Sequence, residues 1–385
     1  MRHETNLLIV GAGPFGLAIA AQASHVGIEH LVVGRPMEFW RSNMPKGMYL
    51  RSECDWHLDP VNVHTIESFL RSQGQTPHDV EPLSLEFYHS YVDWFQRQKQ
   101  ITPLPTYIRQ LDHSTDNDHF IACTLDGRTI QAQKVVIAPG LRHFAHIPDE
   151  LKSRLPAGRL SHTCDFVDFK SAANNRYLII GGRQSAFEWA ALLVEAGASE
   201  VYVAHRHDSP EFTNSDWSWV NPMVDAMVEN PSWFRRLSPP EQEAIARKFF
   251  EEGRLKLEPW LSARVSNNHV KILPRTEVVN SLEQNGQVLV ELTNGDRVSV
   301  DQIILATGYK TNIAQLPLLS SGNILAKLAT RNGFPVLDDH FQTSVGGLFI
   351  TSMPAAQDFG PFFGFTVAVR VSAKLICKAI AQTAG

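Results

Sequence analysis

Two glycine-rich segments carry the residue types that bind phosphate groups. The first, Gly-Ala-Gly-Pro-Phe-Gly at residues 11–16, follows the apolar run 6–10; the second, Gly-Gly-Arg-Gln-Ser-Ala at residues 181–186, follows the run 177–180. Each run predicts a strand, and a helical pattern follows each turn. The N-terminus of such a helix offers free backbone N–H groups to a dinucleotide pyrophosphate. The sequence therefore indicates a flavin site and a nicotinamide site that face one another.

In the first turn each glycine has a separate task. Gly11 makes the turn, Gly13 lets the backbone approach the pyrophosphate, and Gly16 allows the helix to pack closely on the strand. A purely structural glycine turn is the alternative, but a strand, a helix and a second strand all appear at fitting lengths. We expect these glycines, with Pro14 and Phe15 between them, to bind FAD.

The residue that usually binds the adenosine ribose is missing. A carboxylate is expected at the end of the second strand, yet Gly34 stands there and Arg35 follows. Ribose recognition must therefore depend on Arg35, on backbone groups or on a different side chain.

The second turn departs further from the usual pattern. Arg183 replaces the second glycine and Ala186 the third, beside Gly181, Gln184 and Ser185. The arginine side chain would crowd the pyrophosphate unless its guanidinium pairs with phosphate, which its geometry suits. The turn is therefore either a nicotinamide nucleotide site or a nucleotide fold that has lost its ligand.

A basic residue ends the strand that follows the second turn. The predicted strand 200–204 runs into His205 and Arg206. Such a residue commonly holds a ribose 2′-phosphate, which favours NADPH over NADH. The alternative is an arginine that is merely exposed at the surface.

Composition limits the class of protein. The chain has 385 residues, 43% hydrophobic and 19% charged, with a net charge of −5 and scattered basic residues. This is typical of a soluble globular protein of two domains and gives no reason to expect nucleic acid as a partner. No apolar run approaches the ~20 residues that cross a bilayer, and a strand pattern begins almost at once. We expect a cytoplasmic protein without membrane insertion or a secretory or transit peptide.

Neither cysteine nor histidine spacing indicates a metal or redox pair. The four cysteines form no Cys-x-x-Cys motif, which disfavours both a redox disulfide and a zinc knuckle, and a reducing cytoplasm is the simplest setting. None of the sixteen histidines has a partner at helical ligand spacing beside a carboxylate. We therefore expect no metal.

The elements around these motifs can be predicted from periodicity. Strand 6–10, helix 14–26 and strand 30–33 form a first βαβ unit, and helices follow at 65–72 and 84–98. Residues 120–125 and 129–130 predict a hairpin across Asp-Gly. Short strands at 135–138 and 303–306 each lead into an Ala-x-Gly element. The irregular stretch 34–63 is long enough to be functional.

The repetition of turn and strand predicts an α/β fold of two Rossmann-like dinucleotide-binding domains, with the NADPH domain inserted into the FAD domain. The FAD domain comprises residues 1–145 and 306–385, the latter with a strand at 347–351 and a helix at 364–381, and the NADPH domain comprises 146–305. Residues 210–261 hold half of the tryptophans and predict a helical insertion, which either covers a cleft or only supports its domain.

These motifs together resemble the NADPH-dependent flavoprotein monooxygenases: the flavin-containing monooxygenases, the Baeyer–Villiger enzymes and the ornithine and lysine N-hydroxylases. The resemblance rests on both turns, the second read as Gly-Gly-x-Gln-Ser-Ala-x-Glu, and on Ala306-Thr307-Gly308-Tyr309. It implies that Thr307, Gly308 and Tyr309 contact cofactor. A Gly-x-x-x-His signature also matches, ending at His162 between the two domains, where it would lie at the hinge.

Residues 48–52 and 58–60 resemble the flavin-proximal segment of the N-hydroxylases. The resemblance places Trp40, Arg51 and Ser52 along the FAD, with Trp56 and His57 approaching the cleft. The aromatic cluster at residues 359–364 either walls the flavin ring or belongs to the core.

The resemblance implies an activity. NADPH would reduce FAD, and the reduced flavin would capture oxygen as a C4a-hydroperoxyflavin that oxygenates a small molecule at nitrogen, at sulfur or in a Baeyer–Villiger reaction. One alternative is an NAD(P)H-dependent flavin reductase or oxidase that oxygenates no substrate. Another is a non-catalytic flavoprotein that senses redox state. The motifs assign neither catalytic residues nor a particular substrate. The chain is either monomeric or a homo-oligomer.

Overall fold

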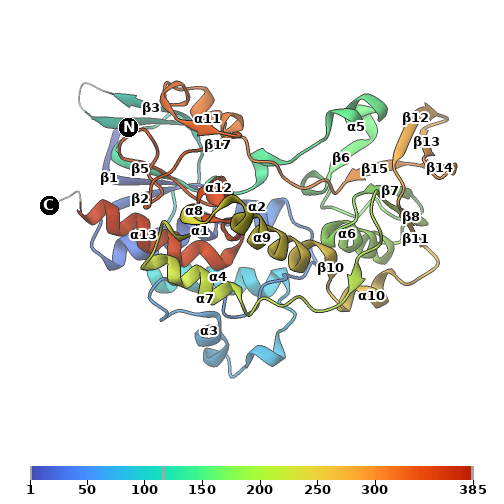
Figure 1. Ribbon diagram of the computed structural model, residues 1–385, viewed down its shortest axis with the longest axis horizontal. Coiled ribbons are helices and arrows are strands. Elements are labelled where there is room, and N and C mark those ends of the chain that lie inside the picture. Colours follow the sequence, from blue (N-terminus) through green and yellow to red (C-terminus); the bar gives the residue numbers. More distant parts are fainter. Residues whose placement is uncertain (1, 115–117, 383–385) are drawn as a thin grey trace.

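The computed structural model describes residues 2–114 and 118–382. Two sheets of mainly parallel strands lie toward opposite ends of the long axis (Figure 1). The strand order in the first sheet is β2-β1-β5-β4-β3, with β18 beside β5. Its strands are β1 (Arg2–Val10), β2 (His30–Val33), β3 (Ile108–Ser114), β4 (His119–Thr124), β5 (Thr129–Ile137) and β18 (Leu348–Ile350).

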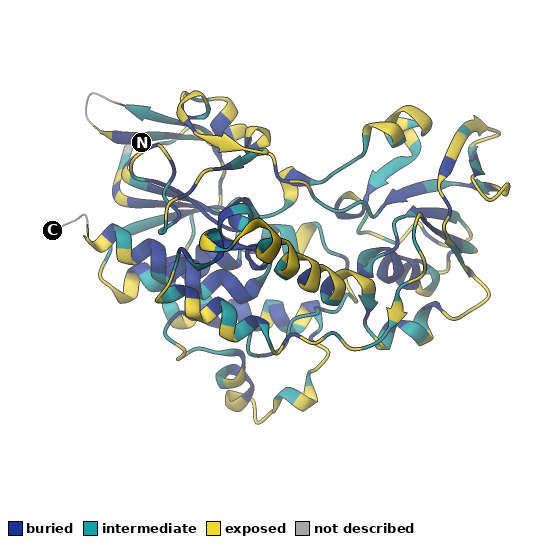
Figure 2. Ribbon diagram, viewed as in Figure 1, coloured by how far each residue is buried: buried dark blue, intermediate teal, exposed yellow. Residues whose placement is uncertain are grey.

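The first βαβ unit forms as predicted. Helix α1 (Pro14–His25) connects β1 to β2, which pair in parallel, and its proline stands in the first turn, where no N–H is needed. Helix α13 (Val369–Gln382) packs beside α1. It starts later than expected because residues 361–368 form 3₁₀ turns. Figure 2 shows the strands of this sheet and the inner faces of both helices as buried.

Strand β5 corrects the sequence prediction. Residues 129–130 and 135–138 were expected in separate strands, but residues 129–137 form one strand of nine residues, and Ala138 follows its end. Its first half pairs antiparallel with β4 and its second half parallel with β18, while β1 pairs along its whole length. The continuous neighbour β1 leaves no place for a break. The edge strand β3 was not predicted.

The second sheet has the order β11-β8-β7-β15-β6, and its paired strands are parallel. All of them lie between β5 and β18 in the chain, so this part is inserted into the chain of the first sheet. Helices α6 and α10 contact one face, and the antiparallel strands β12, β13 and β14 contact the other. The bounds are β6 (Leu160–His162), β7 (Arg176–Ile180), α6 (Gln184–Glu195), β8 (Glu200–His205), α10 (Trp260–Val265), β11 (Val270–Pro274), β12 (Val278–Gln284), β13 (Gln287–Leu292), β14 (Arg297–Val300) and β15 (Gln302–Leu305).

The predicted helical insertion connects the two cores. Trp217 and Phe249 belong to the core of the first sheet, whereas Leu257 and Leu261 belong to that of the second. Helix α9 crosses the middle of the molecule with an exposed outer face (Figures 1 and 2). The segment contains β9 (Glu211–Phe212), α7 (Val220–Asp225), α8 (Trp233–Arg236), α9 (Pro239–Phe250), a π-helical turn (Glu251–Leu255) and β10 (Lys256–Leu257).

Shorter elements complete the fold. Helices α3 and α4 are N-capped by Thr65 and Ser84, whose side chains accept hydrogen bonds from the backbone N–H groups three residues later. No helix in the described part of the chain is long and apolar enough to span a membrane. The remaining bounds are α2 (Glu38–Ser42), α3 (Ile66–Ser72), α4 (Leu85–Lys99), α5 (Asp149–Arg154), α11 (Pro317–Ser320), β16 (Thr330–Arg331), β17 (Phe334–Pro335) and α12 (Ala356–Phe359).

Candidate functional site

Two glycines of the first turn are required by its own packing. Gly11 has a φ of +112°, and a Cβ there would lie 2.2 Å from the carbonyl oxygen of Ala138. A Cβ at Gly16 would lie 1.8 Å from the carbonyl oxygen of Gly11. Any side chain at either position would therefore displace backbone.

Gly13 has no such internal requirement. Its φ of −84° and ψ of −170° suit any residue, and a Cβ would meet no atom within 4 Å. It is the N-cap of α1, whose first amides receive no side-chain cap, while Pro14 and Phe15 are buried. The first amides of α1 are therefore free, and the absence of a side chain at Gly13 leaves the space in front of them open. This arrangement suits a pyrophosphate.

The structure explains the missing ribose carboxylate. Gly34 has a φ of +151°, and a Cβ there would lie 2.8 Å from the backbone nitrogen of Ala12. Arg35 is exposed at the end of β2, stacks over Tyr107 and pairs with Glu38 at 3.2 Å. Glu38 brings a carboxylate to this end of the strand, four residues after Gly34, and is a candidate for the different side chain that the sequence left open.

The second turn follows the same backbone course. Gly181 has a φ of +142°, and a Cβ there would lie 2.5 Å from the carbonyl oxygen of Ala306. Arg183, the N-cap of α6, is extended at φ −116° and ψ −179°. Its guanidinium donates to the carbonyl oxygen of Arg254 at 3.1 Å and stacks 5.0 Å from the ring centre of Phe250. The side chain therefore points along the helical insertion.

Other predicted nucleotide ligands lie around the N-terminus of α6. The Gln184 Oε1 accepts from the backbone N–H of Glu258 at 3.2 Å, and its Nε2 is buried without a partner in the described structure. Ser185 is half-buried on the first turn of the helix, and Arg206 is exposed just after β8. Burial and the nearby charge of Arg206 lower the pKa of Arg183. Two arginines and an unsatisfied amide donor thus surround this turn, a donor set suited to phosphate.

The Ala-Thr-Gly-Tyr element lies where the chain crosses between the two sheets. Thr307 Oγ1 donates to the carbonyl oxygen of His146 at 2.5 Å, and the Gly308 carbonyl oxygen lies 3.0 Å from His162 Nε2. The Tyr309 ring packs edge-on against His162, and burial raises the pKa of its phenol. These contacts join His162 to the crossover, and its predicted hinge position stays a prediction. Burial lowers the pKa of His162.

The predicted flavin-proximal residues have strong partners of their own. Trp40 is half-buried, with its ring centre 4.9 Å from that of Tyr88. Arg51 pairs with Glu258 at 2.7 Å and donates to Ser215 Oγ at 2.6 Å, both in or beside the helical insertion. Ser52, next to it, is half-buried. Arg51 thus joins the 48–52 segment to the insertion, and its predicted contact with flavin stays a prediction.

Glu188 is a buried carboxyl that the site prediction did not include. It is fully buried in α6; its Oε1 accepts from the backbone N–H of Tyr49 at 2.9 Å, and its Oε2 has no partner in the described structure. Burial raises its pKa to about 8. The signal was present in the sequence, because a lone glutamate stands on the apolar face of the predicted helix.

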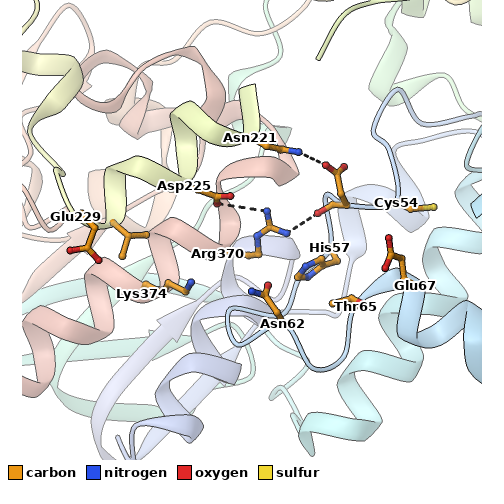
Figure 3. A pocket seen from close by; sticks show the side chains of 12 residues that line it. Cys54, His57, Asn62, Thr65, Glu67, Asn221, Asp225, Glu229, Arg370 and Lys374 are labelled. Carbon is orange, nitrogen blue, oxygen red and sulfur yellow. Dashed lines mark hydrogen bonds and ion pairs between the residues drawn. The ribbon is translucent and has the colours of Figure 1, made fainter. Parts of the chain in front are cut away.

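The remaining predicted residues separate into core and cavity. Trp56 packs edge-on against Trp217, and His57 lines a cavity beside it (Figure 3). Phe359 and Phe363 of the aromatic cluster are fully buried in the core, which favours the structural interpretation of that cluster.

The family follows from comparison with known proteins. Residues 8–233 and 245–351 match two profiles, both described as pyridine nucleotide-disulphide oxidoreductase. The first match covers more than half of the chain, which therefore belongs to this oxidoreductase family. All four cysteines are free, so no disulfide lies in the described structure.

Individual relatives are distant. The chain is 26% identical over 235 residues to an FAD-dependent urate hydroxylase of Xanthomonas campestris pv. campestris, covering 56% of this chain and only 46% of that protein. It is 23% identical over 335 residues to the probable indole-3-pyruvate monooxygenase YUCCA10 of Arabidopsis thaliana, covering 80% and 83%.

A solved structure confirms the fold. The ornithine N-hydroxylase of Kutzneria sp. 744 superposes with a TM-score of 0.83 at 14% identity, over 99% of this chain and all of that one. The expected α/β fold of two Rossmann-type units, and the resemblance to the flavoprotein monooxygenases, are therefore confirmed at the level of architecture.

Proposed function

We propose that the protein is an FAD-containing, NADPH-dependent monooxygenase that oxygenates a small molecule at nitrogen, at sulfur or in a Baeyer–Villiger reaction. The observation that carries this proposal is the pair of matching turns, each with an uncapped helix N-terminus. The hydroxylase and monooxygenases among its relatives support oxygenation over simple flavin reduction.

The first turn would hold FAD. The backbone N–H groups of residues 13, 15 and 16 would bind the pyrophosphate, since Pro14 has none to offer. Arg35 or Glu38 would bind the adenosine ribose, because both lie at the end of β2. When bound, FAD supplies hydride acceptance from NADPH and activation of molecular oxygen for transfer to the substrate.

The second turn would hold NADPH. The first amides of α6 and the unsatisfied Gln184 Nε2 would donate to its pyrophosphate, and Arg206 would bind its ribose 2′-phosphate. Thr307, Gly308 and Tyr309 lie at the crossover, where both nucleotides would meet.

The helical insertion would exclude water from the reaction. Trp217 and Phe249 pack the insertion onto the core of the first sheet. Arg51 donates hydrogen bonds to Gly253 and Ser215 of the insertion. A covered site prevents loss of the activated oxygen as peroxide. We also propose the domain division at residues 145 and 305, and a cytoplasmic protein acting on a small molecule and oxygen.

Absorption and product analysis test this proposal. The purified protein should be yellow and bleach on anaerobic addition of NADPH. In air, NADPH consumption should be matched by oxygenated product with a suitable amine, sulfide or ketone. Stoichiometric hydrogen peroxide with every compound tried would support a reductase or oxidase instead. A bound flavin that NADPH cannot reduce would support a redox sensor.

A further inference from the structure

A cavity of about 530 Å³ opens between the 54–67 segment, helix α7 and helix α13 (Figure 3). This volume is within the range of small-molecule sites. Its walls come from three distant parts of the chain. We call its more buried polar groups the floor and its exposed polar groups the rim, and the two differ in charge.

His57 presents an unused donor to this cavity. Only 7% of the residue is exposed. Its Nδ1 accepts from the backbone N–H of Asp59 at 3.2 Å, so the proton of the neutral ring is on Nε2. Burial lowers the pKa of His57 to about 3, which keeps the ring neutral. The described structure provides no acceptor for the Nε2–H.

Two cations of α13 face the same space. Arg370 and Lys374 are four residues apart and therefore share a face of the helix. Arg370 donates to the carbonyl oxygen of Asp55 at 2.7 Å and makes only a long 3.8 Å contact with Asp225. The Lys374 side chain is half-buried and makes no ion pair or hydrogen bond within the described residues. In Figure 3 its ammonium end is directed toward the cavity.

Three of the four carboxylates of the cavity, those of Glu67, Asp225 and Glu229, are exposed to solvent. The Asp225 side chain is 59% exposed, whereas that of Arg370 is 11% exposed. Asp55 is half-buried; its Oδ2 accepts from Asn221, and its Oδ1 is buried without a partner in the described structure. Water and salt screen charges at the rim, but they screen the floor much less. His57, Arg370 and Lys374 therefore present donors that a bound carboxylate can satisfy, and the unpartnered Asp55 Oδ1 presents an acceptor that a donor on the same molecule can satisfy.

We propose that this cavity binds a small molecule through its carboxylate, which Lys374, Arg370 and the His57 Nε2–H hold at the floor. A carboxylate offers two oxygens to three converging donors, and charge-assisted hydrogen bonds are the strongest available there. The acidic rim favours a ligand whose other end is neutral or cationic over a dianion. The ligand is either the oxygenated substrate, in which case this inference rests on the proposed function, or a separate effector.

Calorimetry on the full chain with its bound cofactor tests the site. The probes are 4-aminobutyrate, its methyl ester as the matched uncharged control, and glutarate as the dianion. We expect 4-aminobutyrate to bind more tightly than glutarate, and the ester not to bind at about 10 mM. Lys374→Met should weaken 4-aminobutyrate binding about tenfold or more. Lys378→Met, one turn further along α13 and exposed, should not.

His57→Phe is the second variant, because it removes the donor and retains an aromatic ring. Equal binding of acid and ester, equal effects of the Lys374 and Lys378 variants, or no carboxylate binding at about 10 mM would overturn the proposal. Flavin content and NADPH oxidation of the wild-type protein are measured without probe. Their absence would count against the proposed monooxygenase and not against this cavity. If Lys374→Met raises the KM for the oxygenated compound, the ligand of the cavity is the substrate. If a carboxylate that is not consumed alters kcat, the ligand is an effector. Both outcomes support the site.

Discussion

The turns at residues 11–16 and 181–186 share a backbone course but differ in how closely helix and strand approach. Gly11 and Gly181 both have positive φ. A Cβ at Gly11 would meet the carbonyl oxygen of Ala138, just after β5, and a Cβ at Gly181 would meet that of Ala306, just after β15. In the first turn a Cβ at Gly16 would collide with Gly11, whereas Ala186 carries a Cβ at the corresponding position of the second turn. Helix α6 therefore lies farther from its turn than α1 does.

The comparison separates two reasons for a glycine. Gly11, Gly16 and Gly181 are needed because backbone atoms lie where a Cβ would be. Gly13 and Arg183 occupy corresponding, extended positions, so the fold accepts a side chain at both. Only a ligand in close contact with the backbone would require glycine at residue 13.

The largest effect is expected from adding a methyl group at the tighter turn. Gly16→Ala should cost about 4 kcal/mol or more, because the added Cβ meets a backbone oxygen that has no room to move. The matched change in the looser turn, Ala186→Gly, should cost only about 1 kcal/mol from helix propensity. Soluble yield and denaturant unfolding measure both. Similar losses in the two variants would show that the turns are equally tight.

Gly13→Val tests whether a ligand explains that glycine. The fold has room for the side chain, so the far-UV circular dichroism should be that of wild type. The valine would occupy the space in front of the α1 amides, so the purified protein should lose its yellow flavin. A folded variant with a full flavin complement would remove the first turn from the cofactor site.

Arg206→Ala examines the second turn. A charge-assisted contact with a 2′-phosphate contributes about 1.5–3 kcal/mol, so the KM for NADPH should rise roughly ten- to a hundredfold. The KM for NADH should stay nearly constant, and Arg275→Ala, an exposed arginine paired with Asp208, is the control. Equal losses with both coenzymes would assign Arg206 a structural role.

Glu188→Gln should have the smallest effect, and one that depends on pH. Its counterpart in α1 is Ala18, so α6 alone carries a buried carboxyl at this position. Burial raises its pKa from 4.5 to about 8, so the folded state keeps a proton that the unfolded state loses across this window. The free energy of unfolding of the wild-type protein therefore falls as pH rises through this window. The unfolding free energy of Glu188→Gln does not include this pH-dependent loss.

Thermal unfolding at constant ionic strength measures this difference. The Tm of Glu188→Gln relative to wild type should increase by a few degrees between pH 5 and pH 9. Glu195→Gln, a half-exposed carboxylate at the end of the same helix, is the control. A Tm difference that does not change with pH would mean that Glu188 is ionised when buried.

Local patterns in the sequence were sufficient for the βαβ units and for the starts of helices α3 and α4. Strand β2 and the capped helices α3 and α4 formed within about a residue of the predictions, because apolar periodicity and N-caps act between near neighbours. The two glycine-rich turns could be found for the same reason, since strand, glycine and helix are consecutive in the chain.

The tertiary structure decided what depends on distant neighbours. Strand β5 is continuous because β1 pairs along its whole length, and Arg183 and Arg51 point to the helical insertion because acceptors from residues 215–258 lie there. The carboxylate cavity draws His57, Asp225 and Lys374 from three segments whose separation in the chain hides their proximity. The sequence determined where a pattern suited to a dinucleotide stands. Packing determined which donors remain unpaired, because a donor gains or lacks a partner only in the folded chain.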